Sequence, residues 1–141
     1  MVGRIYRTID CTEHLESKRN PVPAIQISLY NIHGEKILNN VEAPVDAGYE
    51  GSIMLTSELY NNFLIAELPR RLWRDYRTLT GTVTMRVARA VVEINGVKFN
   101  TFIGSPLFWV GKLLVGREVL SKLAIVIDCS RKETCLVEAL G

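Results

Sequence analysis

Histidine and cysteine are scarce in this sequence, and neither occurs at the spacing of a metal site. The two histidines, His14 and His33, are far apart, and the three cysteines contain no Cys-x-x-Cys pair. Because a zinc site needs several such ligands close together, we expect no metal and no other cofactor. Cys11, Cys129 and Cys135 are most simply thiols in a reducing compartment. A bridge between Cys129 and Cys135 across a hairpin is the open alternative.

Long apolar runs and a strong net charge are absent as well. No apolar stretch approaches the roughly 20 residues that span a bilayer, and the first ten residues lack the apolar core of a signal peptide. We therefore expect a cytoplasmic protein with no membrane partner. The formal net charge of +2 is too small to indicate a polyanionic partner by itself. A length of 141 residues fits one domain, residues 1–141, with a sizeable core.

Alternating apolar residues predict β-structure in the first third of the chain. In the segment 24–32, Ile25, Ile27 and Leu29 alternate with polar neighbours, which is the period of a half-buried strand. Gly34 then supplies a turn. We expect residues 24–43 to form a hairpin.

The second half of the chain has the same character. Within residues 78–94, side chains alternate from Val83 to Ala88 after a glycine turn at Gly81, which predicts β-structure. Asn95-Gly96, directly after this segment, is the strongest short hairpin signal in the sequence. The segment 124–128 reads as a short buried strand, which we expect to pair with residues 134–140.

Helix signals are few. Residues 57–68 are the clearest helix, with Ser57 as its expected cap and Pro69 as its end. Its expected apolar face consists of Leu59, Phe63 and either Leu64 or Ala66. Residues 112–123 read as an apolar run, a glycine and one or two helical turns. The sequence therefore predicts an all-β domain, closed or nearly closed, with one or two short helices.

Asp46 lies between an apolar run and a glycine-rich turn, in the stretch APVDAGYEG. A carboxylate at the end of a buried strand is unfavourable unless it is hydrogen-bonded, paired or shared. An aspartate that satisfies amides of its own turn is the ordinary structural explanation. No other aspartate of the chain precedes a glycine by two positions.

The order of these motifs resembles that of a retropepsin-like aspartic protease. The matching features are Asp46-Ala47-Gly48 after an apolar strand, a later glycine-tipped hairpin, and Leu-Val-Gly-Arg before a short helix. The likeness covers residues 24–130. It implies the closed, barrel-like acid-protease fold with one lobe per chain.

The resemblance also implies a mechanism. In this family two aspartates share one proton, and the pair activates water for peptide-bond hydrolysis. A chain with one Asp-x-Gly triplet must supply the second aspartate from a second copy, so we expect a symmetric homodimer with one Asp46 per protomer. The expected substrate is a peptide or an unfolded protein.

Other site residues follow from the same resemblance. Ala47 and Gly48 complete the active-site loop, and Gly48 leaves room for the substrate backbone. The expected flap, which closes over the substrate, consists of Leu79, Thr80, Gly81 and Thr82.

A second group of residues is expected to support the loop. Leu114, Val115 and Gly116 would pack beneath the catalytic loop. Arg117 would pair with Glu50, four positions after Asp46, although such a pair could also be an ordinary surface ion pair of little energetic value.

Ala47 departs from the family pattern, in which a threonine or serine hydroxyl bonds across the dimer. Each lost hydrogen bond removes on the order of 1 kcal/mol. The alternative hypothesis is therefore a catalytically impaired dimer that serves as a peptide-binding or scaffolding module.

Two further segments leave alternatives open. Residues 69–77 interleave arginines with aromatic residues, a pattern that suits single-stranded nucleic acid. The residues concerned are Arg70, Arg71, Trp73, Arg74, Tyr76 and Arg77. More often such a segment docks its apolar residues, here Leu72, Trp73 and Tyr76, on the core while its arginines face water. Residues 1–20 are expected to be either a terminal arm or an interface strand.

Overall fold

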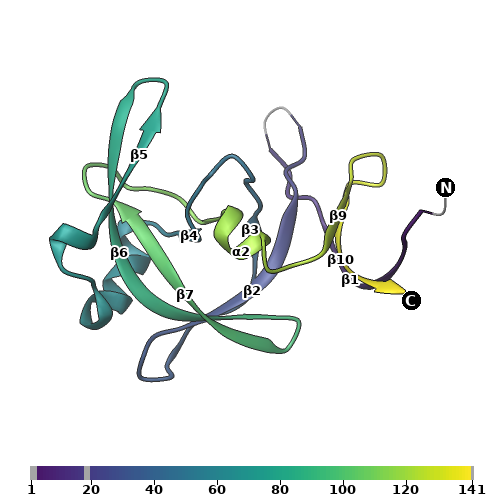
Figure 1. The fold of residues 1–141 in the computed structure, drawn as a ribbon, viewed down its shortest axis with the longest axis horizontal. Helices are drawn as coiled ribbons and strands as arrows, with labels where there is room; N and C mark the ends of the chain where they lie inside the picture. Colours follow the sequence, from purple (N-terminus) through teal and green to yellow (C-terminus); the bar gives the residue numbers. More distant parts are fainter. Residues whose placement is uncertain (1–2, 18–19, 141) are drawn as a thin grey trace.

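In a computed structural model the chain, described for residues 3–17 and 20–140, is built almost entirely of strands (Figure 1). The strands are β1 Ile5–Glu13, β2 Ala24–Tyr30, β3 Lys36–Pro44, β4 Ile53–Met54, β5 Arg74–Thr78, β6 Gly81–Ile94, β7 Val97–Pro106, β8 Leu114–Val115, β9 Ile125–Asp128 and β10 Glu133–Leu140. The short helical segments are α1 Ser57–Tyr60, η1 Asn61–Ala66, η2 Arg70–Leu72 and α2 Arg117–Leu120. The predicted all-β class is confirmed.

The larger sheet closes on itself. Its strand order is β3-β2-β6-β7-β4-β8, and β5 pairs with the first residues of β6, from Gly81 to Met85. Val45, directly after β3, forms a parallel bridge with Val115 of β8 at the opposite end of this order. The two ends of the sheet therefore meet, as the expected barrel-like closure requires.

Both predicted hairpins are present. The β2–β3 hairpin covers residues 24–44, and Gly34 in its turn has a φ of +80°. In the β6–β7 turn, Asn95 and Gly96 have φ values of +50° and +77°. Positive φ at both central residues matches the right-handed twist of the two strands, so this dipeptide sets the register of the longest hairpin in the sheet.

The core lies inside this closed sheet. Ile25, Ile27 and Leu29 of β2 are buried, as their alternation predicts, and Ala88 and Val92 of β6 face them from the neighbouring strand. This packing gives the barrel one continuous apolar interior.

The helical segment 57–68 differs from its prediction in two respects. Thr56 is the cap rather than Ser57, because its hydroxyl accepts the amide of Leu59 at 3.3 Å. After Tyr60 the segment continues as a 3₁₀ helix, in which residues three apart share a face. Tyr60 and Phe63 are therefore fully buried, whereas Leu64 is 44% exposed.

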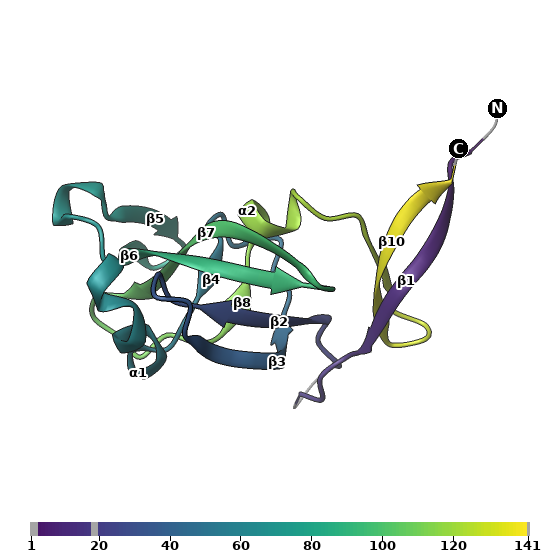
Figure 2. The same cartoon turned by 90° about the horizontal axis from the view of Figure 1, so that it is seen from below.

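The chain ends form a separate three-stranded sheet in the order β1-β10-β9. Figure 2 shows β1 and β10 extending away from the rest of the molecule. Residues 5–13 thus pair with the C-terminal strand of their own chain. Strand β9, expected to be buried, is partly exposed, with Val126 and Ile127 at 44% and 42%. None of the helices in the described residues is long and apolar enough to cross a membrane.

The cysteine pairing differs from the expected alternatives. The β1–β10 register places Cys11 directly opposite Cys135, and the two form a disulfide. Cys129 is a free, exposed thiol in the β9–β10 turn. The suggested bridge between Cys129 and Cys135 is wrong, because Cys135 faces Val126 of β9 rather than the turn.

Candidate active site

Asp46 begins the loop between β3 and β4. Its backbone amide donates to the carbonyl of Val115 at 2.9 Å, which fixes the start of the loop to β8. Its Oδ1 accepts the amide of Gly48 at 2.9 Å, the hydrogen bond of an Asx turn. Asp46, Ala47 and Gly48 are nevertheless exposed in the protomer. The carboxylate is therefore both locally oriented and open to a partner.

The segment after β8 supports this loop from below. The amide of Gly116 donates to Ser52 at 2.6 Å, that of Arg117 to Tyr49 at 2.9 Å, and that of Glu118 to Gly51 at 3.1 Å. A side chain at Gly116 would overlap the carbonyl oxygen of Gly51. Strand β8 and the start of α2 thus hold the loop by its backbone, at the positions where the sequence predicted support.

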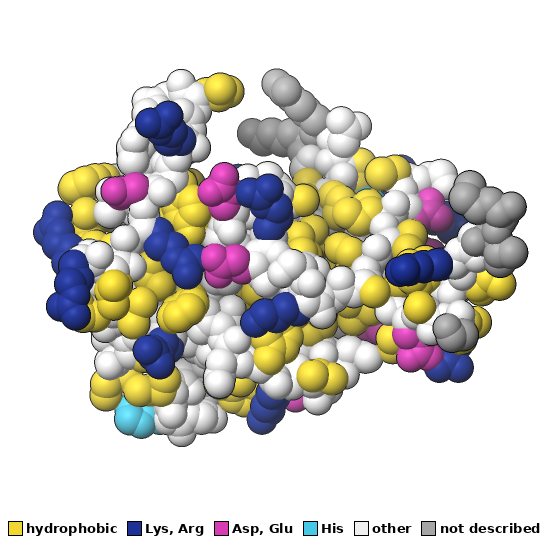
Figure 3. Space-filling view, viewed as in Figure 1, with side chains coloured by type: hydrophobic (Ala, Val, Ile, Leu, Met, Phe, Trp, Pro, Cys, Tyr) yellow, Lys and Arg dark blue, Asp and Glu magenta, His cyan; other side chains and the backbone are white. Residues whose placement is uncertain are grey.

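The expected ion pair between Glu50 and Arg117 is present. Arg117 Nη2 lies 3.5 Å from Glu50 Oε1, with side chains 57% and 68% exposed, respectively. Acidic and basic side chains stand next to each other near the centre of the face in Figure 3. A pair this exposed contributes little to stability, so its value is as a link between the loop and α2.

The candidate flap is the turn of the β5–β6 hairpin. Leu79 at the turn is fully exposed, and the Thr78 hydroxyl donates to the carbonyl of Gly81 at 2.8 Å. Gly81 has a φ of +133°, a conformation that L side chains rarely adopt. The hairpin and the β3–β4 loop rise on the same side of the molecule (Figure 1).

Residues 69–77 are partly buried at Trp73, Arg74 and Tyr76, whereas the other arginines of the segment are exposed. The indole of Trp73 donates to the carbonyl of Leu68 at 2.9 Å, and Arg70 stacks over its ring. Tyr76 packs on Tyr49 with ring centroids 5.6 Å apart. Both aromatic rings are thus engaged within the protein, which favours the docking interpretation, although Leu72 is 49% exposed rather than docked.

Sequence reasoning missed Tyr49, which adjoins the Asp-x-Gly triplet. Its ring packs against Met54, Met85 and Leu114, beneath the candidate flap. Burial, followed by the neighbouring Tyr76, raises the pKa of Tyr49 well above its ordinary value, so its hydroxyl stays protonated. A large aromatic residue between two glycines, Gly48 and Gly51, was the available signal in the sequence.

One group of potential metal ligands lies within the described residues. Ligand atoms of Cys11, Glu133 and Cys135 lie within 4.8 Å of one another. The two sulfurs form the disulfide, and a metal requires thiolates, so these residues do not fit a metal site in this form.

No protein-family model matches the chain, and no curated protein does. Among solved structures, a retropepsin-like aspartic protease from Rickettsia conorii is similar at a TM-score of 0.56 and 18% identity, over 100% of this chain and 98% of that one. The EIAV protease in complex with the inhibitor HBY-793 has a TM-score of 0.48 and 16% identity, over 77% of this chain and 93% of that one. The first of these shows that the chain has the retropepsin-like fold.

Proposed function

We propose that this chain, as a single domain, is an aspartic endopeptidase that acts as a symmetric homodimer. The observation that carries the proposal is the Asp46 loop, which begins with an exposed carboxylate and is held by Val115, Gly116 and Arg117 within a retropepsin-like fold. Such close backbone support of an exposed aspartate is expected where the position of its carboxylate matters for function. Its partner in the reaction is Asp46 of a second copy.

The chemistry needs two carboxylates that share one proton. Two like charges at short range cannot both ionise, so one carboxyl group stays protonated while the other takes a proton from water. The water attacks the peptide carbonyl, and the protonated carboxyl group donates its proton to the carbonyl oxygen. The C–N bond then breaks as the other carboxyl group gives the proton it took from water to the leaving nitrogen, and the carboxylate that lost its proton regains it from the hydroxyl group as the new carboxyl group forms. Because the two groups titrate as a pair, neither role belongs permanently to one protomer.

The substrate is proposed to bind as an extended strand between the loop and the β5–β6 hairpin. Backbone pairing would give affinity, and alternate side chains would enter pockets. Gly48 presents no side chain to this strand. Leu79, Thr80, Gly81 and Thr82 would close over it as the flap, with the exposed Leu79 supplying apolar contact.

A second candidate function rests on Ala47. This residue has no hydroxyl to bond across the dimer, so the dimer would depend on other surfaces. Strand β1 offers one, since Ile5, Tyr6 and Ile9 are 65%, 45% and 47% exposed. A dimer that binds peptide without cleaving it would be a scaffolding module with the same cleft.

The test is cleavage of an unfolded protein between about pH 3 and pH 7, because one carboxyl group must keep its proton. Asp46→Asn is the matched control, since it preserves shape and removes the acid. Cleavage that Asp46→Asn abolishes supports the endopeptidase. Absent cleavage by a protein that sediments as a dimer supports the scaffold, and restoration by Ala47→Thr would identify the missing hydroxyl as the cause. Cleavage that survives in Asp46→Asn would refute the proposed mechanism.

A further inference from the structure

Strand β5 is attached to the body of the protein by very few side chains. It pairs with β6 alone, and along it Asp75, Arg77 and Thr78 are exposed. Only Arg74 and Tyr76 are partly buried and turn inward. The freedom of the β5–β6 hairpin relative to the barrel therefore depends mainly on what these two side chains contact.

Tyr76 contacts the candidate catalytic loop. Its ring meets that of Tyr49 at 5.6 Å between centroids, with the planes tilted by 57°, a geometry favourable for aromatic pairs. Both hydroxyls lie over Gly51, where a Cβ would come within 2.5 Å of one and 2.9 Å of the other. The absence of a side chain at Gly51 therefore leaves room for this aromatic pair.

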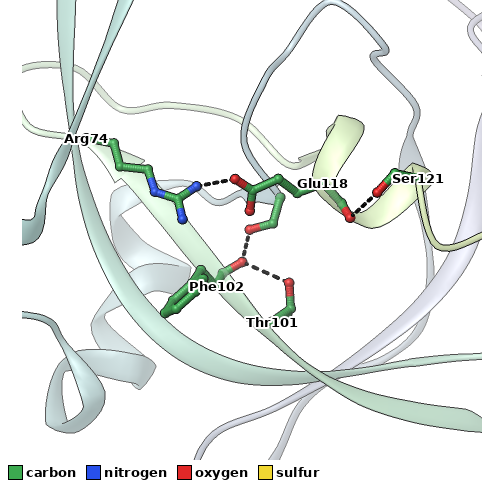
Figure 4. A network of polar contacts seen from close by, with 6 residues as sticks. Arg74, Thr101, Phe102, Glu118 and Ser121 are labelled. Atoms are coloured by element: carbon green, nitrogen blue, oxygen red, sulfur yellow. Dashed lines mark hydrogen bonds and ion pairs between the residues drawn. The ribbon is translucent and has the colours of Figure 1, made fainter.

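Arg74 contacts the helix that braces the same loop. Its guanidinium forms an ion pair with Glu118 at the start of α2, shown in Figure 4. It also stacks over the ring of Phe102 on β7, 5.3 Å from the centroid. The amide of Glu118 in turn donates to Gly51 of the loop at 3.1 Å.

These contacts connect the loop with β5, β5 with α2, and α2 with the loop. We infer that the hairpin-root cluster, defined as Tyr49, Arg74, Tyr76 and Glu118, couples the β5–β6 hairpin to the catalytic loop. Its members are positioning residues: they set where the hairpin stands over the loop and take no part in proton transfer. The kinetic consequence of this inference rests on the proposed endopeptidase function.

The four residues lie in three separate parts of the sequence, and the contacts between them hold the loop, β5 and α2 together. Without the Tyr49–Tyr76 contact, β5 would be a solvated edge strand held only through β6 and Arg74. Without the Arg74–Glu118 pair, the half-buried guanidinium would keep its contacts with Phe102 and Tyr76 but lose its link to α2. Loosening the cluster should therefore increase the local opening of the hairpin without unfolding the barrel.

The test is hydrogen exchange of the backbone amides of residues 74–85, with those of β2 as an internal reference. Glu118→Gln and Tyr76→Ala should each speed exchange in the hairpin by about tenfold, as expected for a charged hydrogen bond or an aromatic pair of about 1.4 kcal/mol. Asp75→Asn is the matched control, since it removes a charge on the outward side of the same strand but keeps an oxygen that can accept the Thr84 hydroxyl. That variant should change exchange by less than about twofold.

A charge swap separates the specific pair from general damage. Arg74→Glu should loosen the hairpin, and the double variant Arg74→Glu with Glu118→Arg should restore most of its protection. The inference is overturned if hairpin exchange is unchanged in Glu118→Gln and Tyr76→Ala, if Asp75→Asn has an equal effect, or if the swap restores nothing.

Kinetics supply the second readout. If the chain cleaves peptides, Glu118→Gln should raise KM several-fold more than it lowers kcat, because the hairpin contacts substrate and not the reacting water. A fall confined to kcat would contradict a positioning role. If the wild-type protein cleaves nothing, the proposed function fails. The exchange measurements still show whether the cluster couples the hairpin to the loop.

Discussion

Asp46 and Val115 are joined by a 2.9 Å hydrogen bond from the amide of the first to the carbonyl of the second. It continues the parallel bridge between Val45 and Val115, so the point where the barrel closes is also the point where the candidate catalytic loop begins. The position of the carboxylate is thus fixed by the closure of the whole sheet. A change that weakens the closure should disturb both stability and the site.

Gly116→Ala should be strongly destabilising. The residue has a φ of −99°, which alanine adopts readily, so the effect is steric rather than conformational. A Cβ there would overlap the Gly51 carbonyl and the ring of Tyr49. Such overpacking costs about 1–3 kcal/mol or more, measurable as a lower midpoint in urea.

Gly3→Ala is the control for this substitution, because no atom lies within 4 Å of a Cβ at that position. It should leave the midpoint unchanged. Equal stability of Gly116→Ala and the wild type would show that the loop can move away from β8, and would remove the argument that the loop is rigidly braced.

Two glutamates in ion pairs should differ sharply in their contribution to stability. Glu67 accepts from the Tyr60 hydroxyl at 2.8 Å and from Arg86 Nε at 3.0 Å, in a partly buried network. Glu50 faces Arg117 in water. Glu67→Ala should lower the free energy of unfolding by about 2–3 kcal/mol, because it leaves the buried Tyr60 hydroxyl without its acceptor. Glu50→Ala should lower it by at most about 1 kcal/mol. Urea titration of both variants would measure the difference, and equal costs would contradict this account.

The parts of the fold that were predictable from the sequence are those set by local chemistry. Asn95-Gly96 fixed its hairpin because few other dipeptides adopt two positive φ values, and Gly116-Arg117 marked a strand-to-helix junction that passes close to another backbone. The support expected from Leu114, Val115 and Gly116 came from motif order. Val115 and Gly116 hydrogen-bond to the backbone of the Asp46 loop, and Leu114 belongs to the cluster against which Tyr49 of this loop packs. The expected pair of Glu50 with Arg117 is also present.

The parts that could not be predicted depend on the packing of distant segments. The Cys11–Cys135 disulfide follows from the register between the two ends of the chain, which no local pattern encodes. The side chain of Tyr49 lies against Gly51, Gly104 and Gly116, which come together from three separate segments. Leu72, which looks like a core residue in sequence, lies in a short 3₁₀ turn whose geometry leaves it exposed.

The disulfide should stabilise the terminal sheet. Cys11→Ser and Cys135→Ser should each lower the free energy of unfolding by about 2–4 kcal/mol under oxidising conditions. Cys129→Ser, which removes the free thiol, should have no effect. Alkylation before reduction should label Cys129 alone, as mass spectrometry would show. Labelling of Cys11 in the untreated protein would contradict the pairing, and equal stability of all three variants would show that the bond contributes little.

The turn between β9 and β10 should respond to acid through Asp128. Its Oδ1 accepts the amides of Arg131 and Ser130 at 3.0 and 3.1 Å and the Ser130 hydroxyl at 2.8 Å. These bonds favour the charged form and lower the pKa of Asp128 below its ordinary value of 3.8, the Arg131 amide contributing most.

The sign of the pH effect follows from the direction of this shift. Because the pKa is lower in the folded protein, the contribution of Asp128 to stability is complete above about pH 4, the unfolded value. It is lost as the pH falls through the folded value. NMR titration should place the midpoint of Asp128 below 3.8, and Ser130→Ala should raise it only part of the way, since both amide donors remain. A midpoint at the ordinary value would show that the turn is open in solution.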